Sequence, residues 1–253
     1  MKSNVTVVIQ TYNEENNLKD CIESARHLTD DIVIVDTEST DNTVNLAKDM
    51  GIQVFTFPFS KIVEPAREFG VQRGNHDWVF LLDADERFTP ELIDEIKEAI
   101  KTTEFTHYKV PRKEIFGKKT WLQYGGWWPN YIIRLIHKPS FQTWPKAIHS
   151  TPEVIGACGM LSHALLHYSK NDYEVIVNKT AVFEDQESDL LYKANKSVST
   201  PIFFRKFFGE IYRRLIKKSG YKDGTIGIIE SIYQGFSKTI TYLYLYEKKH
   251  KSH

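Results

Sequence analysis

Three acidic side chains stand directly after one of the most apolar stretches of this 253-residue chain. Residues 78–86 read WVFLLDADE, so that Asp83, Asp85 and Glu86 follow five apolar residues. Carboxylates at positions i and i+2 of an extended chain can point the same way, where they repel each other. Mg²⁺ or Mn²⁺ removes that repulsion, because such ions bind one or two carboxylates together with phosphate oxygens of a substrate. The pattern therefore suits metal-assisted chemistry on a phosphorylated ligand, while helix capping or simple solvent exposure of the acids is the alternative that the pattern alone leaves open.

A repeated strand-and-helix pattern over the first hundred residues predicts how these acids are positioned. Apolar runs predict buried strands at 5–10, 31–36, 53–57 and 78–83, and helical spacing follows each run. Such alternation predicts a parallel sheet covered by helices on both faces, in which ligands bind beyond the carboxyl ends of the strands. Asp36, Asp83 and the sequence Thr11-Tyr12-Asn13 all stand at such ends.

Beyond residue 105 the pattern changes. Short strand-like pieces separated by loops rich in Gly, Pro and Trp predict an antiparallel extension of the sheet over 106–168. We therefore predict a domain over 1–168, with halves 1–105 and 106–168, and a helical region over 169–253. Within that region, residues 201–218 place aromatic and aliphatic side chains on one side of a helix and basic ones on the other, which is typical of helices that lie on a membrane surface. Packing of the apolar side on the rest of the protein is the alternative.

Composition and charge restrict the class of protein. Hydrophobic residues make up 41% of the chain and charged residues 26%, as in globular proteins with a real core. The net charge is zero, but residues 201–253 hold eleven Lys or Arg against four Asp or Glu, which predicts an anionic partner for this part. An anionic membrane fits better than nucleic acid, because no nucleic-acid-binding motif is found. Cys21 and Cys158 lack the spacing of a disulfide scaffold or a zinc site, and we expect neither a signal peptide nor a spanning helix.

Four motifs occur in order: VVIQTYNEENNL, DDIVIVDTESTDNT, AREFG and WVFLLDADE. This set, over roughly residues 4–100, resembles the family 2 glycosyltransferases, which have the GT-A fold. The later stretches GGWWPNYIIRLI, AIHS, LLHYS and GYKDGTIG are similar, more loosely, to the branch that contains lipopolysaccharide-core glucosyltransferases. The resemblance implies a Rossmann-like, mostly parallel α/β sheet. It also implies metal-dependent, inverting transfer of a sugar from a nucleotide sugar, most often a UDP-sugar.

The resemblance implies donor-binding roles for a set of residues at the strand ends: Thr11, Tyr12, Glu14, Asp36, Arg67, Asp83, Ala84 and Asp85. The first three would lie under the base and ribose, and Asp36 would bind the uracil or ribose side. Arg67 would reach the phosphates, and Asp85 would bind the Mg²⁺ or Mn²⁺ that bridges the diphosphate. Glu14 could instead simply begin a helix, since acids favour helix N-termini.

The acceptor side departs from the family pattern. Relatives carry Tyr-Pro-Asp and Val-His-Glu where this chain has Trp128-Pro129-Asn130 and Ile148-His149-Ser150, so that two acids are missing. Inverting transfer to a hydroxyl normally needs a base to take the proton. The candidates for catalysis are Glu86, His149, Glu153 and Arg134. His149 could instead bind the metal beside Asp85, or be a structural histidine, and we expect Trp127, Trp128 and Asn130 to bind the acceptor.

The function expected from this resemblance is transfer of a sugar to a glycan or glycolipid in the synthesis of cell-envelope polysaccharide. It would take place in the cytoplasm, at the inner face of the membrane. A polyprenyl-phosphate glycosyltransferase is one alternative, because a phosphate acceptor is already an anion and needs no base. A non-catalytic module that binds a nucleotide sugar or a membrane is another.

Overall fold

The computed structural model describes residues 3–60, 62–102, 104–117, 119–145, 150–170 and 173–251. The chain forms two compact units, which are described separately below. The first unit comprises Met1–Arg112 and Asn130–His167, and the second comprises Lys113–Pro129 and Tyr168–His253. We predicted a boundary after residue 168; the last change of unit lies between His167 and Tyr168, and residues 113–129 also belong to the helical unit.

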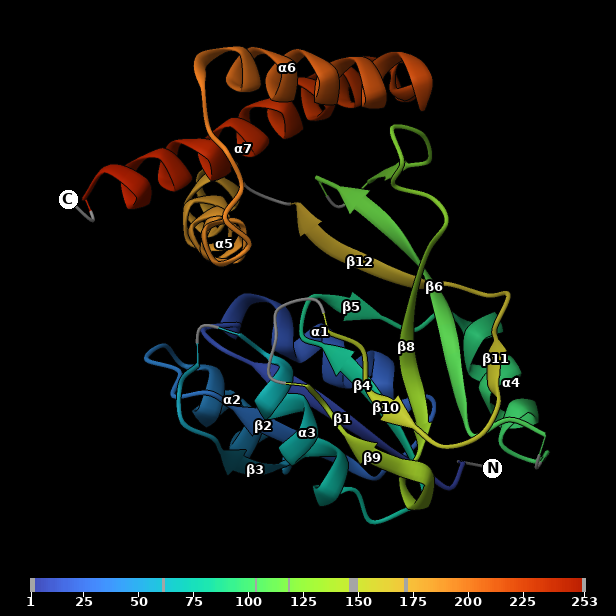
Figure 1. Ribbon diagram of the computed structural model, residues 1–253. Helices are drawn as coiled ribbons and strands as arrows, with labels where there is room; N and C mark the ends of the chain where they lie inside the picture. Colours follow the sequence, from blue (N-terminus) through green and yellow to red (C-terminus); the bar gives the residue numbers. More distant parts are fainter. Residues whose placement is uncertain are drawn as a thin grey trace. The chain divides into compact units, whose positions relative to one another are not determined.

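The first unit begins with four parallel strands and the helices between them. These elements are β1 (Val5–Thr11), α1 (Glu15–Arg26), β2 (Ile32–Asp36), α2 (Thr43–Asp49), β3 (Gln53–Thr56), α3 (Glu64–Arg73) and β4 (Trp78–Asp83). The strands lie in the order β3-β2-β1-β4 (Figure 1). The chain moves outward from β1 to β3 and then returns to place β4 on the other side of β1. Ligands of open α/β sheets bind at such a reversal of strand order.

Alternate residues of β1 and β4 face opposite sides of the sheet, as the two-residue repeat of a strand requires. Val7 and Ile9 pack with Phe80 and Leu82 in one apolar cluster, which also holds side chains of α1 and α4 (Pro90–Ala99). Val8 packs in a second cluster with residues of β4 and α3. Both faces are therefore covered, and this explains why the strands read as continuous apolar runs.

An antiparallel part extends the sheet beyond β4. Its strands are β5 (Glu86–Arg87), β6 (His107–Phe116), β8 (Asn130–His137) and β12 (Leu165–Lys170). β8 pairs antiparallel with both β4 and β6, while β12 pairs antiparallel with β5. The short β11 (Cys158–Met160) pairs with β6, and β9 (Phe141–Thr143) with β10 (Glu153–Val154) forms a separate pair after the turn η1 (Lys138–Ser140).

The second unit is mainly helical. It holds β7 (Thr120–Leu122), α5 (Tyr173–Lys193), α6 (Thr200–Ile211), the π-helical turn η2 (Tyr212–Lys217), the 3₁₀ turn η3 (Gly220–Asp223) and α7 (Gly224–Lys251). α6 runs along α7 (Figure 1), and Gly235 of α7 lies close to Phe207 and Ile211 of α6. A Cβ added there would lie 2.7 Å from Ile211 Cγ1, so that a glycine is needed for this packing.

A polar contact joins α5 to α7: the buried Glu184 carboxylate accepts hydrogen bonds from the hydroxyls of Ser237 and Thr241. In the part of the chain that is described, no helix has the combined length and apolar character that crossing a bilayer requires. The predicted fold is confirmed: a Rossmann-like parallel half, an antiparallel extension and a C-terminal helical region.

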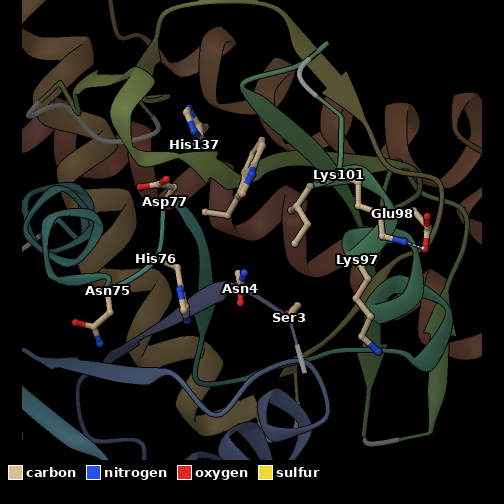
Figure 2. A pocket seen from close by; sticks show the side chains of 11 residues that line it. Ser3, Asn4, Asn75, His76, Asp77, Lys97, Glu98, Lys101 and His137 are labelled. Atoms are coloured by element: carbon tan, nitrogen blue, oxygen red, sulfur yellow. Dashed lines mark hydrogen bonds and ion pairs between the residues drawn. The ribbon is translucent and has the colours of Figure 1, made fainter. Parts of the chain in front are cut away.

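A cavity of about 720 Å³ lies at the amino-terminal ends of β1 and β4. Asn4, which precedes β1, and His76, which precedes β4, line it together with Lys97 of α4 (Figure 2). Asp83 stands at the other end of β4, roughly 17 Å away for a six-residue strand. This cavity is therefore separate from the strand ends at which ligands of such sheets bind.

Candidate functional site

The carboxyl ends of β1 and β2 hold a buried pair of polar side chains. Thr11 and Asp36 are paired in register at the last position of each strand, and the Thr11 hydroxyl donates to Asp36 Oδ1 at 2.8 Å. The same carboxylate accepts hydrogen bonds from the backbone N–H of Ser39 at 2.9 Å and from its hydroxyl at 2.6 Å. Asp36 is thus held in one orientation before any ligand arrives.

Hydrogen bonds join the two loops that follow these strands. The Asn13 N–H donates to Ser39 Oγ at 2.8 Å, and the Asn13 side-chain oxygen accepts from the Thr40 N–H at 2.8 Å. Asn13 adopts a left-handed backbone (φ 53°), which Asn tolerates better than most residues. The Glu14 N–H donates to Thr43 Oγ1 at 2.8 Å. The loops therefore form one rigid wall.

An exposed aromatic pair stands next to this wall. The ring of Tyr12 lies 4.7 Å from that of Phe59, and both side chains are exposed. Large exposed rings that contact each other at a sheet end offer an apolar surface to a flat ligand. The sequence pattern identified Tyr12 but not Phe59, which lies 47 residues later in the chain.

Asp83, at the end of β4, binds two arginines. Arg67 of α3 donates from Nη2 to both carboxylate oxygens, at 2.9 and 3.0 Å, and Arg134 of β8 binds the same carboxylate. Burial alone would raise the pKa of Asp83, but the two guanidinium groups outweigh that effect and hold the pKa well below its usual range. Asp83 therefore remains ionised at neutral pH, with part of its side chain still accessible.

Glu86 lies behind Asp83 and is fully buried. Its carboxylate contacts Arg134 Nη2 at 2.8 Å and Arg112 Nη1 at 3.4 Å, and it accepts the backbone N–H of Asp83 at 3.0 Å. Burial would lower the pKa of Arg134, yet the two carboxylates beside it raise that pKa above the ordinary value. Two carboxylates and three guanidiniums, including Arg67, thus form one network at the end of β4, with a surplus of one positive charge.

The turn that carries Asp85 is fixed from below. Arg87 donates to the carbonyl oxygens of Ala84 and Glu86 at 2.7 and 2.8 Å, and to that of Asn17 at 2.8 Å. The thiol of Cys21 lies beneath the turn, 3.6 Å from the carbonyl oxygen of Asp83. Burial raises the pKa of this thiol, so that Cys21 remains protonated and serves as an apolar floor.

Asp85 faces a histidine from a distant strand. The antiparallel pairing of β5 with β12 places His167 opposite Glu86, and His167 Nε2 lies 3.4 Å from Asp85 Oδ1. Both side chains are mostly buried. A carboxylate and an imidazole are suitable ligands for Mn²⁺, and carboxylate oxygen also suits Mg²⁺.

No group of three or more His, Cys, Asp or Glu side chains arranged to hold a metal occurs within the described ranges. A cation bridged by substrate phosphate needs only one or two protein ligands, however. Asp85 and His167 provide two groups of the appropriate chemistry, and so the residues present fit such an ion.

The residues predicted for the acceptor side are spread over both units. Arg134 is buried in the network described above, and Asn130 begins β8 opposite Arg112. Glu153 is exposed on β10, where it pairs with Thr143 of β9. The prediction for His149 falls outside the described residues.

Trp144, the residue after β9, connects the β9–β10 strand pair to Arg67. The ring of Trp144 lies 5.7 Å from the guanidinium of Arg67, and its indole N–H donates to the carbonyl oxygen of Ser150 at 3.2 Å. The Trp144 backbone N–H donates to Glu68 Oε2 at 2.9 Å. The strand pair that carries Glu153 is therefore tied to α3 next to Arg67.

Trp127 and Trp128 belong to the second unit. The guanidinium of Arg214 lies 4.6 Å from the ring of Trp127, and Trp128 packs edge-on against Trp121 at 5.4 Å. The loop before them is held by Asp223, whose carboxylate accepts the N–H of Tyr124 at 2.8 Å. These contacts give both rings a packing role within the unit, and their role toward an acceptor stays a prediction.

Arg112 and His167 were not among the predicted site residues. Both come from the antiparallel extension, and long-range strand pairing brings them to the acids. The LLHYS stretch, which contains His167, was part of the family resemblance. Only the register of β12 with β5 shows that His167 lies beside Asp85.

Comparison with known proteins gives matches along most of the chain. The model of the family "Glycosyl transferase family 2" matches residues 6–177. An uncharacterized glycosyltransferase of Rickettsia typhi is 29% identical, covering 98% of this chain and 88% of its own length. Another, from Rickettsia prowazekii, is 28% identical, covering 92% and 84%.

Among solved structures, glucosyl-3-phosphoglycerate synthase from Mycobacterium tuberculosis, in complex with Mn²⁺, uridine diphosphate and phosphoglyceric acid, has a TM-score of 0.51. The similarity covers 78% of this chain and 80% of that one at 16% identity, and it concerns the fold.

Proposed function

This chain belongs to glycosyl transferase family 2, and we propose from that premise that it transfers a sugar from a nucleotide-sugar donor to a glycan or lipid-linked acceptor. The observation that carries the proposal is the position of Asp36 and Asp83 at the carboxyl ends of β2 and β4, the two parallel strands that flank β1, with Asp85 in the turn after β4. This is the edge of the sheet at which such folds bind ligands. Glycosyl transfer needs a site for base and ribose, a site for the diphosphate and a route for one proton. Each corresponds to a group described above.

For the base and ribose we propose the wall formed by the loops after β1 and β2. The exposed ring of Tyr12, supported by Phe59, would stack on the base, and the fixed carboxylate of Asp36 would accept a hydrogen bond from base or ribose. Thr11 and Glu14 would act through this wall, because both are bonded to its other members. A uridine nucleotide is the first candidate, since the mycobacterial synthase of similar fold holds uridine diphosphate.

For the diphosphate we propose Arg67 and the turn that carries Asp85. Arg67 is anchored on Asp83, which limits how far its charge can move when a phosphate arrives. Asp85 and His167 would hold Mg²⁺ or Mn²⁺, which would neutralise charge on the leaving diphosphate. Ala84 has a small side chain in this turn, and Arg87 fixes the carbonyl groups of Ala84 and Glu86, which stand on either side of Asp85.

As the base that takes the proton of the acceptor hydroxyl we propose Glu153, with His149 as the alternative. Glu86 was a candidate from sequence, but its full burial and its bonds to Arg134, Arg112 and the Asp83 N–H favour a positioning role instead. Glu153 is exposed and stands on the strand pair that Trp144 ties to the Arg67 region. Glu153→Gln should lower kcat more than it raises KM and remove the acidic limb of the pH–rate profile. An unchanged profile would instead favour His149 as the base or a phosphate acceptor, which needs no base.

The decisive experiment is calorimetric titration with UDP, GDP, CMP and dTDP, each with Mn²⁺ and with EDTA. We expect metal-dependent binding of one nucleotide, and at least tenfold weaker binding for Asp85→Asn in the presence of Mn²⁺. Asp94→Asn is the matched control, because Asp94 is exposed on α4 and should leave affinity unchanged. A folded protein that binds none of the nucleotides would contradict the proposal. Binding without any transfer or hydrolysis of a nucleotide sugar would favour a non-catalytic binding module.

A further inference from the structure

The segment formed by α6 and η2 in the second unit has two distinct apolar rows, of which one packs on α7 and is half-buried. Phe203 contacts the ring of Tyr242 on α7, with ring centroids 6.5 Å apart, and Ile211 packs on Gly235. The Phe207 carbonyl oxygen also lies close to Gly235, because a Cβ added to Gly235 would be 3.1 Å from it. This row therefore accounts for the packing of α6 on α7.

A second row, displaced by one residue, faces solvent. Phe204, Phe208, Tyr212 and Ile216 follow one another at intervals of four residues and are 61, 59, 61 and 52% exposed. The rings of Phe204 and Phe208 are nearly parallel, with centroids 6.3 Å apart. Single exposed apolar residues are ordinary, but a contiguous row of four large ones marks an interaction surface.

Basic side chains flank the exposed row. Arg205, Arg213 and Lys217 each follow a member of the row by one position and are themselves exposed. Residues 200–218 hold six Lys or Arg and one acid, Glu210, whose carboxylate is bound by Arg213 and Arg214. The outward face thus combines large apolar groups with a surplus of positive charge.

We propose that this exposed row and its basic flank form a docking face for an anionic lipid bilayer. Aromatic and aliphatic side chains enter the boundary between headgroups and acyl chains, while Lys and Arg beside them contact the headgroups. A second copy of the chain is a poorer partner, because a symmetric contact through this face would bring two surpluses of positive charge together. The proposal does not depend on sugar transfer, but it would bring the protein to lipid-linked acceptors.

The test is sedimentation of the full chain with large vesicles of phosphatidylcholine, alone or with 30 mol% phosphatidylglycerol, in about 0.1 M salt. We expect at least tenfold tighter binding to the anionic vesicles, since each basic residue near the surface contributes about fivefold. The double variant Phe204→Ser/Phe208→Ser should lose at least tenfold in affinity for them. Val182→Ser is the matched control, because Val182 is equally exposed on α5 but lies outside the row.

A charge variant separates the two parts of the face. Arg205→Glu/Lys217→Glu should lose most of the preference for anionic vesicles, and 0.5 M salt should do the same to the unmodified protein. Circular dichroism and thermal unfolding check that each variant is folded. Equal binding to both vesicle types, or unchanged binding by the Phe204→Ser/Phe208→Ser variant, would overturn the proposal. So would a dimer in sedimentation velocity that depends on Phe204 and Phe208 and does not bind vesicles. Nucleotide binding is measured in parallel, and its presence or absence bears on the proposed function alone.

Discussion

Replacing Glu86 by Gln tests whether the ionic network at the end of β4 holds the candidate site in place. The substitution keeps the shape of the side chain and an oxygen that can accept the Asp83 N–H, but it removes the charge opposite Arg134 and Arg112. The network then changes from one surplus positive charge to two. The loss of unfolding free energy should be large, because Glu86 is fully buried and water cannot compensate for the missing negative charge.

Removing one partner of a buried ion pair costs about 3–5 kcal/mol. The retained hydrogen bond and the unchanged volume place the Gln variant near the lower limit, at about 3 kcal/mol of unfolding free energy. Donor affinity should fall as well, because Arg134 also binds Asp83, which in turn anchors Arg67.

The free energy is measured by urea unfolding, followed both by tryptophan fluorescence and by far-ultraviolet circular dichroism, whose agreement tests two-state behaviour. Glu98→Gln is the matched control. Its carboxylate lies 2.6 Å from Lys101 Nζ but is 72% exposed, so the same substitution should cost less than about 0.5 kcal/mol. A Glu86 variant as stable as the control would refute the view that buried charges hold this site together.

Three further predictions concern single residues. Gly70→Ala should destabilise the protein by about 1–3 kcal/mol in urea unfolding, because a Cβ there would lie 2.7 Å from Val8 Cγ1. Gly209→Ala is the control: a Cβ at this helical position would have no neighbouring atom within 4 Å, so the substitution should be neutral or stabilising. The pKa of Asp83 is depressed below its unfolded value of about 3.9, so its contribution to stability is complete above about pH 4 and is lost as the pH falls toward the folded pKa. Asp83→Asn should therefore make the midpoint of urea unfolding depend less on pH between pH 6 and 2. An unaltered pH dependence would contradict this. Thr11→Val should weaken nucleotide binding severalfold by removing one of the bonds that orient Asp36, as calorimetry would show, while equal affinity would mean that Ser39 alone suffices.

The parallel half of the fold could be predicted closely from sequence because its signals are local. Buried strands appear as apolar runs, and β4 lies at the predicted residues 78–83. The position of Asp36 and Asp83 at strand ends follows from the same runs. The start of α4 also follows from a local signal, because Thr89 is a good N-cap residue and its side chain accepts the Leu92 N–H.

The partners of these acids could not be predicted in the same way. Arg112 and His167 reach the site through the register of β6 with β8 and of β12 with β5, and register depends on pairing between residues far apart in the chain. The double row of α6 was hidden for another reason. Adjacent apolar pairs such as Phe203 and Phe204 make one wide apolar side in the sequence, and only the position of α7 shows which member of each pair is covered.

The reactivity of the Cys21 thiol, beneath the turn that carries Asp85, can be used to measure local opening of the candidate site. Cys21 is buried and protonated, and an alkylating reagent can reach it only when the turn above it opens, whereas Cys158 is exposed and can react without such opening. The ratio of the two modification rates therefore measures how often the floor of the site opens in the native protein. A nucleotide bound at the turn should slow labelling of Cys21 and leave that of Cys158 unchanged, so two native cysteines suffice to follow the site without any introduced probe.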